Sequence, residues 1–180
     1  MLKRITVFCG SADNCPEKYK EAAVEFGRVL ARQGRALVYG SGQCGLMGKT
    51  AQGAKEEKGY VVGINVERFA DYAPYPGTDE LLMLPTLPER KAALIERGDA
   101  CVALPGGIGT LDELLDIYAL VQAGILDKPL GLLNTDGYFD GLLLQLRRAL
   151  KDGFVNEKDF NRLCVAEDPE ALLEKLDRAE

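Results

Sequence analysis

Short apolar runs alternate with longer amphipathic segments along most of the chain. The runs are rich in Val, Ile and Leu, which favour buried strands. They predict seven strands, at residues 5–9, 36–39, 60–66, 80–84, 100–104, 129–133 and 163–166. In the other segments apolar residues recur at about the helical spacing of 3.6. These segments predict helices at 16–34, 46–58, 86–98, 110–123 and 139–152, and a last helix that Asp168 caps.

This alternation indicates an α/β fold with right-handed crossovers between parallel strands. We predict one domain over residues 1–180, a single doubly wound, Rossmann-like parallel sheet of about seven strands with helices on both faces. No internal repeat or low-complexity segment interrupts the pattern. Ligands of such sheets bind beyond the carboxyl ends of the strands, near the point where the strand order reverses. We expect the functional site there.

Residues 67–79 are the exception, because they show no periodicity. The segment contains three aromatic residues and two prolines, which favours an ordered loop over a flexible linker. A loop of this length in a compact domain is often functional.

The most informative stretch is the turn after the strand at 100–104. Pro105 ends that strand, since proline cannot donate to a ladder. The glycines Gly106, Gly107 and Gly109 allow a sharp turn and a close approach to a ligand. Thr110 is expected to cap the helix that follows. A strand, a glycine turn and a helix start together form an anion site, for which phosphate is the expected ligand.

A second glycine turn, at residues 40–45, has the Gly-x-Gly-x-x-Gly spacing of dinucleotide sites, and Glu67 ends the next strand. That pattern normally follows the first strand, with an acidic residue about 20 residues further on. Three interpretations stay open: a dinucleotide site, a contact from Gly42 to the phosphate or ribose of a substrate, and a tight turn with close helix–strand packing. We favour the second.

Charged residues begin the helix at 86–98. Thr86-Leu-Pro-Glu89 is a capping-box pattern, and Arg90 and Lys91 follow it. Two cations in a first helical turn face the positive end of the helix dipole, which is unfavourable by roughly 0.3–1 kcal/mol each. Either a bound anion reverses that sign, or the cations lie in solvent with Glu89 as compensation.

Glu113 also allows two interpretations. Thr110-x-x-Glu113 is itself a capping-box pattern, so the carboxylate could accept a hydrogen bond from the Thr110 N–H. The same carboxylate projects from the turn that would hold a substrate, where it could act chemically. Asp112 and Asp116 lie one turn apart on a neighbouring face. We expect them to be solvated or to complement the helix dipole.

Composition narrows the classes of function. The net charge of −6, without a basic stripe, argues against a nucleic-acid partner. The absence of histidine removes Ser-His-Asp and Cys-His catalysis and most zinc catalysis. No apolar run approaches the about 18 residues of a membrane span, so we expect a cytoplasmic protein without a membrane partner. The five scattered cysteines show no metal-ligand spacing, and we expect them to be small buried residues.

Two motifs together resemble a known family. Pro105-Gly-Gly-x-Gly-Thr110-x-x-Glu113, with Glu89-Arg-Lys91 upstream, is similar to the LONELY GUY (LOG) family of nucleoside 5′-monophosphate phosphoribohydrolases, long mislabelled lysine decarboxylases. The likeness covers nearly the whole chain and includes Val7-Phe-Cys-Gly-Ser11, Gly45-Leu-Met-Gly48 and Asp136-Gly-Tyr138. The chain departs from the family at Gly40-Ser41-Gly42 and Asn65-Val66, which help to shape the base and ribose pocket.

The resemblance implies hydrolysis of the N-glycosidic bond of a purine-type nucleoside 5′-monophosphate, such as AMP or a cytokinin riboside monophosphate. The products would be free base and ribose 5-phosphate, with no metal or organic cofactor. Arg90 and Glu113 would be the catalytic pair. The residues implied in substrate binding are Gly106, Gly107, Gly109 and Thr110 for the phosphate, and Ser11 and Lys91 in the pocket. A homodimer is implied too, with the apolar side of the helix at 110–123 (Leu111, Leu114, Leu115, Tyr118) in the core or the interface.

The main alternative is a non-catalytic carrier of a nucleotide or of molybdenum cofactor, because related carriers share the fold and the glycine turns. Lysine decarboxylase is disfavoured, since the chain shows no Ser/His-Lys pattern that would anchor its cofactor. A nicotinamide oxidoreductase rests only on the turn at 40–45.

Overall fold

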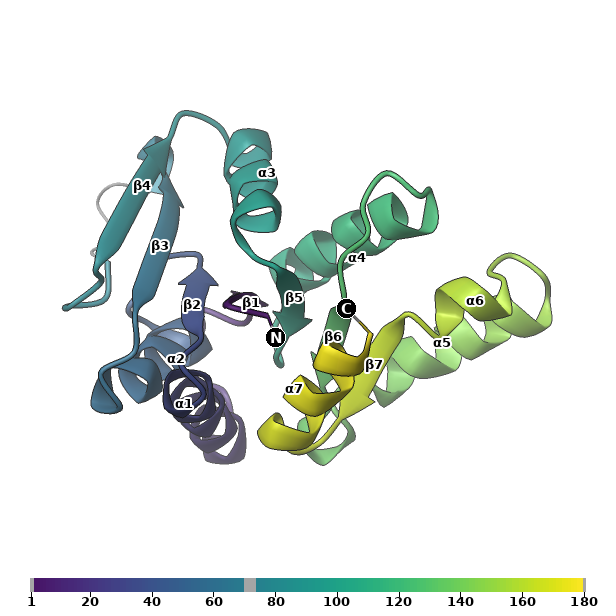
Figure 1. Cartoon of the computed structure of the whole chain (residues 1–180), viewed down its shortest axis with the longest axis horizontal. Coiled ribbons are helices and arrows are strands. Elements are labelled where there is room, and N and C mark those ends of the chain that lie inside the picture. The colour runs from purple at the N-terminus through teal and green to yellow at the C-terminus, as the bar shows by residue number, and fades with distance from the viewer. Residues whose placement is uncertain (1, 70–73, 180) are drawn as a thin grey trace.

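The computed structural model describes residues 2–69 and 74–179. This part of the chain forms one parallel sheet (Figure 1). Its seven strands are β1 Arg4–Phe8, β2 Ala36–Tyr39, β3 Val61–Val66, β4 Glu80–Leu84, β5 Ala100–Ala103, β6 Leu130–Leu133 and β7 Leu163–Ala166. Each strand starts and ends within one residue of its predicted position, so the apolar runs identified the sheet correctly.

The strand order is β4-β3-β2-β1-β5-β6-β7. The chain starts in the middle of the sheet, builds outward from β1 to β4, and then returns to add β5 on the free side of β1. In the parallel pairing of these two strands Ile5 lies opposite Ala100 and Phe8 opposite Ala103. The order therefore reverses between β1 and β5, which confirms the doubly wound topology and marks the expected ligand position.

Helices cover both faces of the sheet, as predicted. They are α1 Glu17–Arg32, α2 Gly45–Glu56, α3 Leu87–Arg97, α4 Ile108–Gln122, α5 Asp140–Lys151, α6 Glu157–Phe160 and α7 Pro169–Arg178. The core on one face is built with α1, α2 and α7, and the core on the other with α3, α4 and α5. Successive strand residues alternate between the two cores, as with Val7 and Phe8. The short α6 and the 3₁₀ turns Glu67–Phe69 and Thr135–Gly137 were not predicted, because so few residues carry no periodicity.

Side-chain caps fix two helix starts as predicted. Thr86 and Glu89 form the capping box of α3, and Asp168 caps α7 by accepting from the Ala171 N–H at 2.9 Å. The predicted cap of α4 is wrong: its N-cap residue is Gly107, no side chain caps it, and Thr110 lies inside the first turn. The Thr110 side chain packs over Gly106 instead, where an added Cβ would lie 2.1 Å from the threonine Oγ1.

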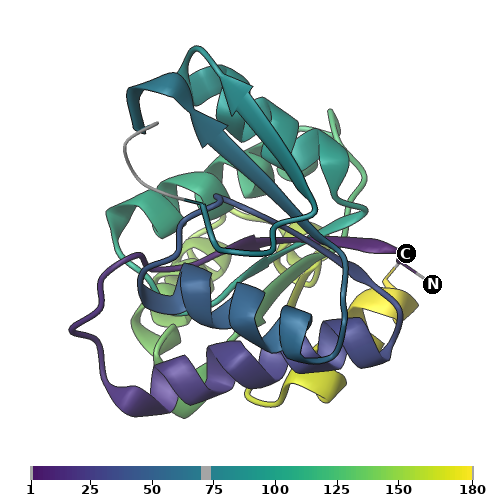
Figure 2. The ribbon, with the colours of Figure 1, turned by 90° about the vertical axis from the view of Figure 1, so that its left-hand side faces the viewer.

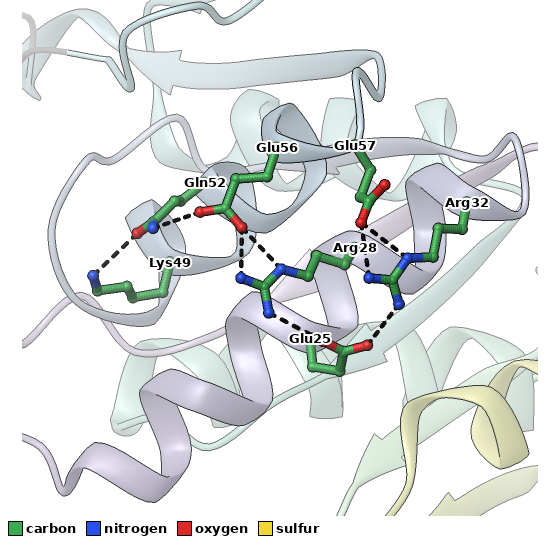
Figure 3. A network of polar contacts seen from close by, with 7 residues as sticks. All are labelled: Glu25, Arg28, Arg32, Lys49, Gln52, Glu56 and Glu57. Atoms are coloured by element: carbon green, nitrogen blue, oxygen red, sulfur yellow. Dashed lines mark hydrogen bonds and ion pairs between the residues drawn. The ribbon is translucent and has the colours of Figure 1, made fainter.

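Helices α1 and α2 lie side by side on one face and approach to backbone contact (Figure 2). A Cβ added at Gly27 would lie 2.1 Å from the Thr50 carbonyl oxygen, and one added at Gly53 would lie 1.9 Å from that of Val24. A network of ion pairs and hydrogen bonds spans the same helices on the outside (Figure 3). Exposed ion pairs contribute little to stability, so the glycine contact holds the pair together.

The segment predicted as an ordered loop is described only at its ends, since residues 70–73 lie outside the described part of the chain. At its start Glu67–Phe69 forms a 3₁₀ turn. At its end the Tyr75 N–H donates to the Ser41 carbonyl at 3.2 Å, and Pro74 pairs with Gly42 in an isolated antiparallel bridge. The end of the loop is thus fixed to the second glycine turn.

The cysteines match their prediction in part. Cys9 and Cys101 are buried and Cys15 and Cys164 half-buried, but Cys44 is exposed. Cys44 occupies the N-cap position of α2, at the end of the second glycine turn, which places it at the surface. All five are free thiols.

Candidate active site

The loops after β1 and β5 meet backbone to backbone at the point where the strand order reverses. The Gly10 N–H donates to the Pro105 carbonyl at 3.0 Å. A Cβ added at Gly10 would lie 3.2 Å from the Gly106 Cα, and one added at Gly106 would lie 2.8 Å from the Gly10 nitrogen. Both positions therefore require glycine for this close approach.

The turn after β5 presents free donors at the start of α4. The Leu111 N–H makes the first bond within the helix, to the Gly107 carbonyl at 3.1 Å. The N–H groups of the preceding residues 108–110 come before that bond and have no partner within a helix. Gly107 and Gly109 are exposed, with no atom within 4 Å of an added Cβ. The helix dipole adds positive potential here, so this turn suits an anion.

The second glycine turn differs, because the protein itself occupies the donors at the start of α2. The Gly45 N–H donates to the Asp13 carboxylate at 2.7 Å, and the Leu46 N–H donates to the Gly10 carbonyl at 2.8 Å. Gly42 packs against Met47, whose Cε would lie 2.5 Å from an added Cβ. This geometry favours the tight turn over the dinucleotide site. No sequence pattern indicates that Asp13 fills this position.

Arg90 of α3 and Glu113 of α4 form an ion pair beside these turns. Their Nη1 and Oε1 atoms are 2.6 Å apart, with only 15% and 13% of the two side chains exposed. The Arg90 Nε also donates to the carbonyl of Ile64 in β3, at 3.2 Å. The capping-box interpretation of Glu113 is therefore not what the structure shows: its carboxylate faces the guanidinium.

Burial raises the pKa of Glu113, and the positive charge of Arg90 opposes that rise without cancelling it. Burial together with the Glu113 carboxylate raises the pKa of the neighbouring Cys9, which keeps that thiol protonated. Perturbed carboxyl groups of this kind are suited to acid–base chemistry.

Lys91 pairs with α4 as well. Its Nζ lies 3.2 Å from an oxygen of Asp112 and 3.2 Å from one of Asp116. Burial lowers the pKa of Lys91, but these two carboxylates outweigh it and the net pKa is raised. Asp112 and Asp116 are 58% and 40% exposed, in line with the expectation that they are solvated, and they bind a lysine in addition, which the sequence did not indicate. Ser11 is exposed in the loop directly after Gly10.

The guanidinium of Arg90 lies over Gly40, a contact that the sequence did not indicate. A Cβ added at Gly40 would lie 2.1 Å from the Arg90 Nη2. Because the guanidinium is also held by Ile64 and Glu113, it has little freedom to move aside. The glycine at this position therefore sets the place of the Arg90 side chain.

The variant Gly40→Ala is expected to displace the guanidinium and to lower kcat for the reaction proposed below by about 10²-fold, since a misplacement of about 1 Å has this effect. The global fold should survive, because the atom met is the end of a side chain. Steady-state kinetics and thermal unfolding measure both quantities. Gly141→Ala is the matched control, since an added Cβ meets nothing there within 4 Å. Wild-type kcat in Gly40→Ala would show that the position of the guanidinium does not matter.

The parallel sheet, whose strand order reverses between β1 and β5, places the protein in the Rossmann-type α/β class. At that point it presents an anion-binding glycine turn with free helix-start donors, next to the buried Arg90–Glu113 pair. Among the described residues no group of three or more His, Cys, Asp or Glu could hold a metal ion. No helix within that part of the chain has the length and apolar character to cross a membrane.

Comparisons with known proteins identify the family. A family model described as "Possible lysine decarboxylase" matches residues 47–176. The probable cytokinin riboside 5′-monophosphate phosphoribohydrolase LOGL9 of Oryza sativa subsp. japonica is 40% identical over 177 residues, which cover 98% of this chain and 78% of the relative. The cytokinin riboside 5′-monophosphate phosphoribohydrolase LOG5 of Arabidopsis thaliana has the same identity and coverage. The chain belongs to this LOG family.

A solved structure with the same fold is that of a cofactor-binding protein. The molybdenum cofactor binding protein from the phototrophic bacterium Rippkaea orientalis matches with a TM-score of 0.74 and 25% identity, over 99% of this chain and 97% of that one.

Proposed function

We propose that this protein is a phosphoribohydrolase that cleaves the N-glycosidic bond of a purine-type nucleoside 5′-monophosphate, AMP or a cytokinin riboside monophosphate. The observation that carries the proposal is the buried pair Arg90–Glu113 beside a turn with free helix-start donors. The reaction type is supported by relatives that are 40% identical over nearly the whole chain and are described as cytokinin riboside 5′-monophosphate phosphoribohydrolases.

In the proposed mechanism the helix-start N–H groups at 108–110 hold the 5′-phosphate, with Gly106, Gly107, Gly109 and Thr110 shaping the turn. Cleavage of an N-glycosidic bond passes through an oxocarbenium-like transition state, which a nearby carboxylate stabilises. Glu113 fills this role and takes a proton from the attacking water. The water oxygen bonds to C1′ as the C1′–N bond breaks. The base leaves with the electrons of that bond, and the proton that Glu113 took from the water is returned to the base. Arg90 holds the Glu113 carboxylate and faces the phosphate or ribose.

The other predicted binding residues take supporting roles in this proposal. Ser11 is exposed beside the phosphate turn and can donate its hydroxyl to the substrate. Lys91 joins α3 to α4 through Asp112 and Asp116 and so supports the helix that carries Glu113. Gly42 lies in the turn after β2 and contributes to the ribose side, next to Pro74.

A carrier function is the second candidate, favoured by the similarity to the molybdenum cofactor binding protein. Both candidates use an anion-binding turn. They differ in Glu113, which only the enzyme needs for turnover.

Incubation of the purified protein with AMP, other nucleotides and a cytokinin riboside monophosphate tests the proposal. Chromatography follows free base and ribose 5-phosphate. Release of both in equal amounts supports the hydrolase. Binding of the nucleotides without any release would favour the carrier.

The value of kcat/KM should fall on the acid side of its pH profile, with an apparent pKa above the usual range of a glutamate. The pKa of Glu113 is raised by burial, and the base must be deprotonated to act, so the rate rises as pH increases through this raised pKa. In Arg90→Gln the opposing positive charge is lost, and this apparent pKa should rise in the residual activity. An unchanged apparent pKa would show that another group titrates.

We further propose a homodimer that uses the exposed apolar side of α4. Leu115 and Ile108 are 43% and 82% exposed, whereas Leu114 and Tyr118 are buried in the core and are not available to a partner. Sedimentation of the wild type and of Leu115→Glu tests this: a dimer that becomes a monomer is expected. The cytoplasmic location and the absence of a nucleic-acid partner remain predictions of the sequence.

A further inference from the structure

The carbonyl of Gly106 in the phosphate turn accepts a hydrogen bond from a distant side chain. The Tyr138 hydroxyl donates to this oxygen at 2.6 Å, across 32 residues of sequence. The carbonyl belongs to the planar peptide that links Gly106 to Gly107. The C=O and N–H of a trans peptide point in opposite directions. The bond from Tyr138 therefore also directs the Gly107 N–H.

The turn needs such a restraint, because its glycines leave the backbone permissive. An added Cβ would meet nothing within 4 Å at Gly107 or Gly109, so no neighbouring side chain crowds these two residues. On the side facing β1, the turn is held by the bond from the Gly10 N–H to the Pro105 carbonyl. Tyr138 supplies the second restraint, on the side facing α5.

Tyr138 is itself held from several directions. Its ring packs edge to face on Tyr19 of α1 at 5.3 Å and on Phe139 at 5.1 Å. The turn that carries it is fixed by Asn134, whose amide oxygen accepts from the Phe139 N–H at 2.6 Å and whose amide nitrogen donates to Asp140 at 2.9 Å.

An ion pair between Lys18 of α1 and Asp136 joins the same turn to the first helix. Asp136 has a φ of 53°, a left-handed conformation that is unusual for a residue other than glycine. The phenol is thus presented to the phosphate turn by a preformed support built from α1 and the segment after β6.

We propose that Tyr138 is a positioning residue of the phosphate turn: its hydroxyl fixes the Gly106–Gly107 peptide so that the Gly107 N–H and the helix-start N–H groups that follow it are aligned before a phosphate arrives. The inference rests on the proposed function of this turn as the phosphate site. Tyr138 acts through the backbone, because its hydroxyl proton is already donated to Gly106. Preorganisation of this kind raises affinity, because less conformational entropy is lost when the ligand binds.

The variant Tyr138→Phe tests the proposal, since it removes the hydroxyl and keeps the ring that packs on Tyr19 and Phe139. We expect the KM for AMP to rise by about three- to tenfold, the range of one lost hydrogen bond, with kcat within about twofold of wild type. The affinity for ribose 5-phosphate, measured by calorimetry, should fall by a similar factor. The Tm should stay close to that of the wild type.

Two other variants complete the design. Tyr60→Phe is the matched control, because it removes the same hydroxyl from an exposed tyrosine. Tyr60 lies next to the start of β3, at the opposite end of the strands from the site. This control variant should leave KM and Tm unchanged. Tyr138→Ala removes the ring as well and should show at least the same loss of affinity together with a lower Tm.

Unchanged KM and unchanged ribose 5-phosphate affinity in Tyr138→Phe would overturn the proposal. A loss of affinity in Tyr138→Phe that is accompanied by a clear fall in Tm would overturn it too, because the hydroxyl would then stabilise the fold and not specifically the turn. The calorimetry needs no turnover, so it tests Tyr138 even if the protein does not hydrolyse AMP. Failure of the wild type to bind ribose 5-phosphate would overturn the positioning role itself.

Discussion

The variant Glu113→Gln is expected to lower kcat for base release by about 10²–10⁴-fold, the range for loss of a general base. The amide keeps the size of the side chain and its oxygen can still accept from Arg90, so the ion pair becomes a hydrogen bond from the charged guanidinium to a neutral acceptor. The negative charge that stabilises an oxocarbenium-like transition state is lost. Affinity for AMP should change by only a few-fold, because the phosphate contacts lie at the start of α4.

Single-turnover kinetics with AMP and calorimetric binding separate these two effects. Glu96→Gln serves as control, since it makes the same chemical change at an exposed carboxylate on α3. Base release at the wild-type rate in Glu113→Gln would remove Glu113 from the mechanism. Loss of binding together with turnover would point to a structural role for the Arg90–Glu113 pair.

The variant Gly53→Ala should lower stability by about 3 kcal/mol, the upper part of the range for an overpacked site. The added methyl carbon would lie 1.9 Å from the carbonyl oxygen of Val24 and 2.8 Å from its carbonyl carbon. Both are backbone atoms of α1, so relief requires the two helices to move apart. In a chain of this length the Tm should fall by roughly 6–12 °C.

Calorimetric unfolding measures this effect, and Gly141→Ala is again the matched control. Gly141 also lies in a helix, but an added Cβ there meets nothing within 4 Å. Alanine has the higher helix propensity, so the control should gain about 0.5–1 kcal/mol. Equal Tm values for the two variants would show that α1 and α2 separate at little energetic cost.

Much of the fold could be predicted from the sequence because its signals are local. The apolar runs located all seven strands to within one residue, and Thr86 and Asp168 marked two helix starts correctly. The start of α4 was misplaced because a threonine is a common cap, whereas here a glycine holds the N-cap position.

The site was harder to predict from the sequence, because its contacts join segments that are far apart along the chain. Arg90 and Glu113 are separated by 23 residues and meet only because α3 and α4 pack on the same face of the sheet. Only the family resemblance implied that these two residues act as a catalytic pair, because no rule of sequence spacing predicts a contact between them. The roles of Gly40 and Asp13 had no signal, since each depends on which side chain or helix end the fold places next to it.

The position of β1 between β2 and β5 has a consequence for folding kinetics. Pairing β1 with β5 closes a loop of about 95 residues, which is entropically costly and is typical of slowly folding, non-local topologies. In the half of the sheet from β1 to β4, each strand pairs with the next strand along the chain. The contact between Gly10 and Gly106, by contrast, forms only when β5 has paired with β1. We expect a newly made chain to acquire its ligand site only after residues beyond α4 have left the ribosome.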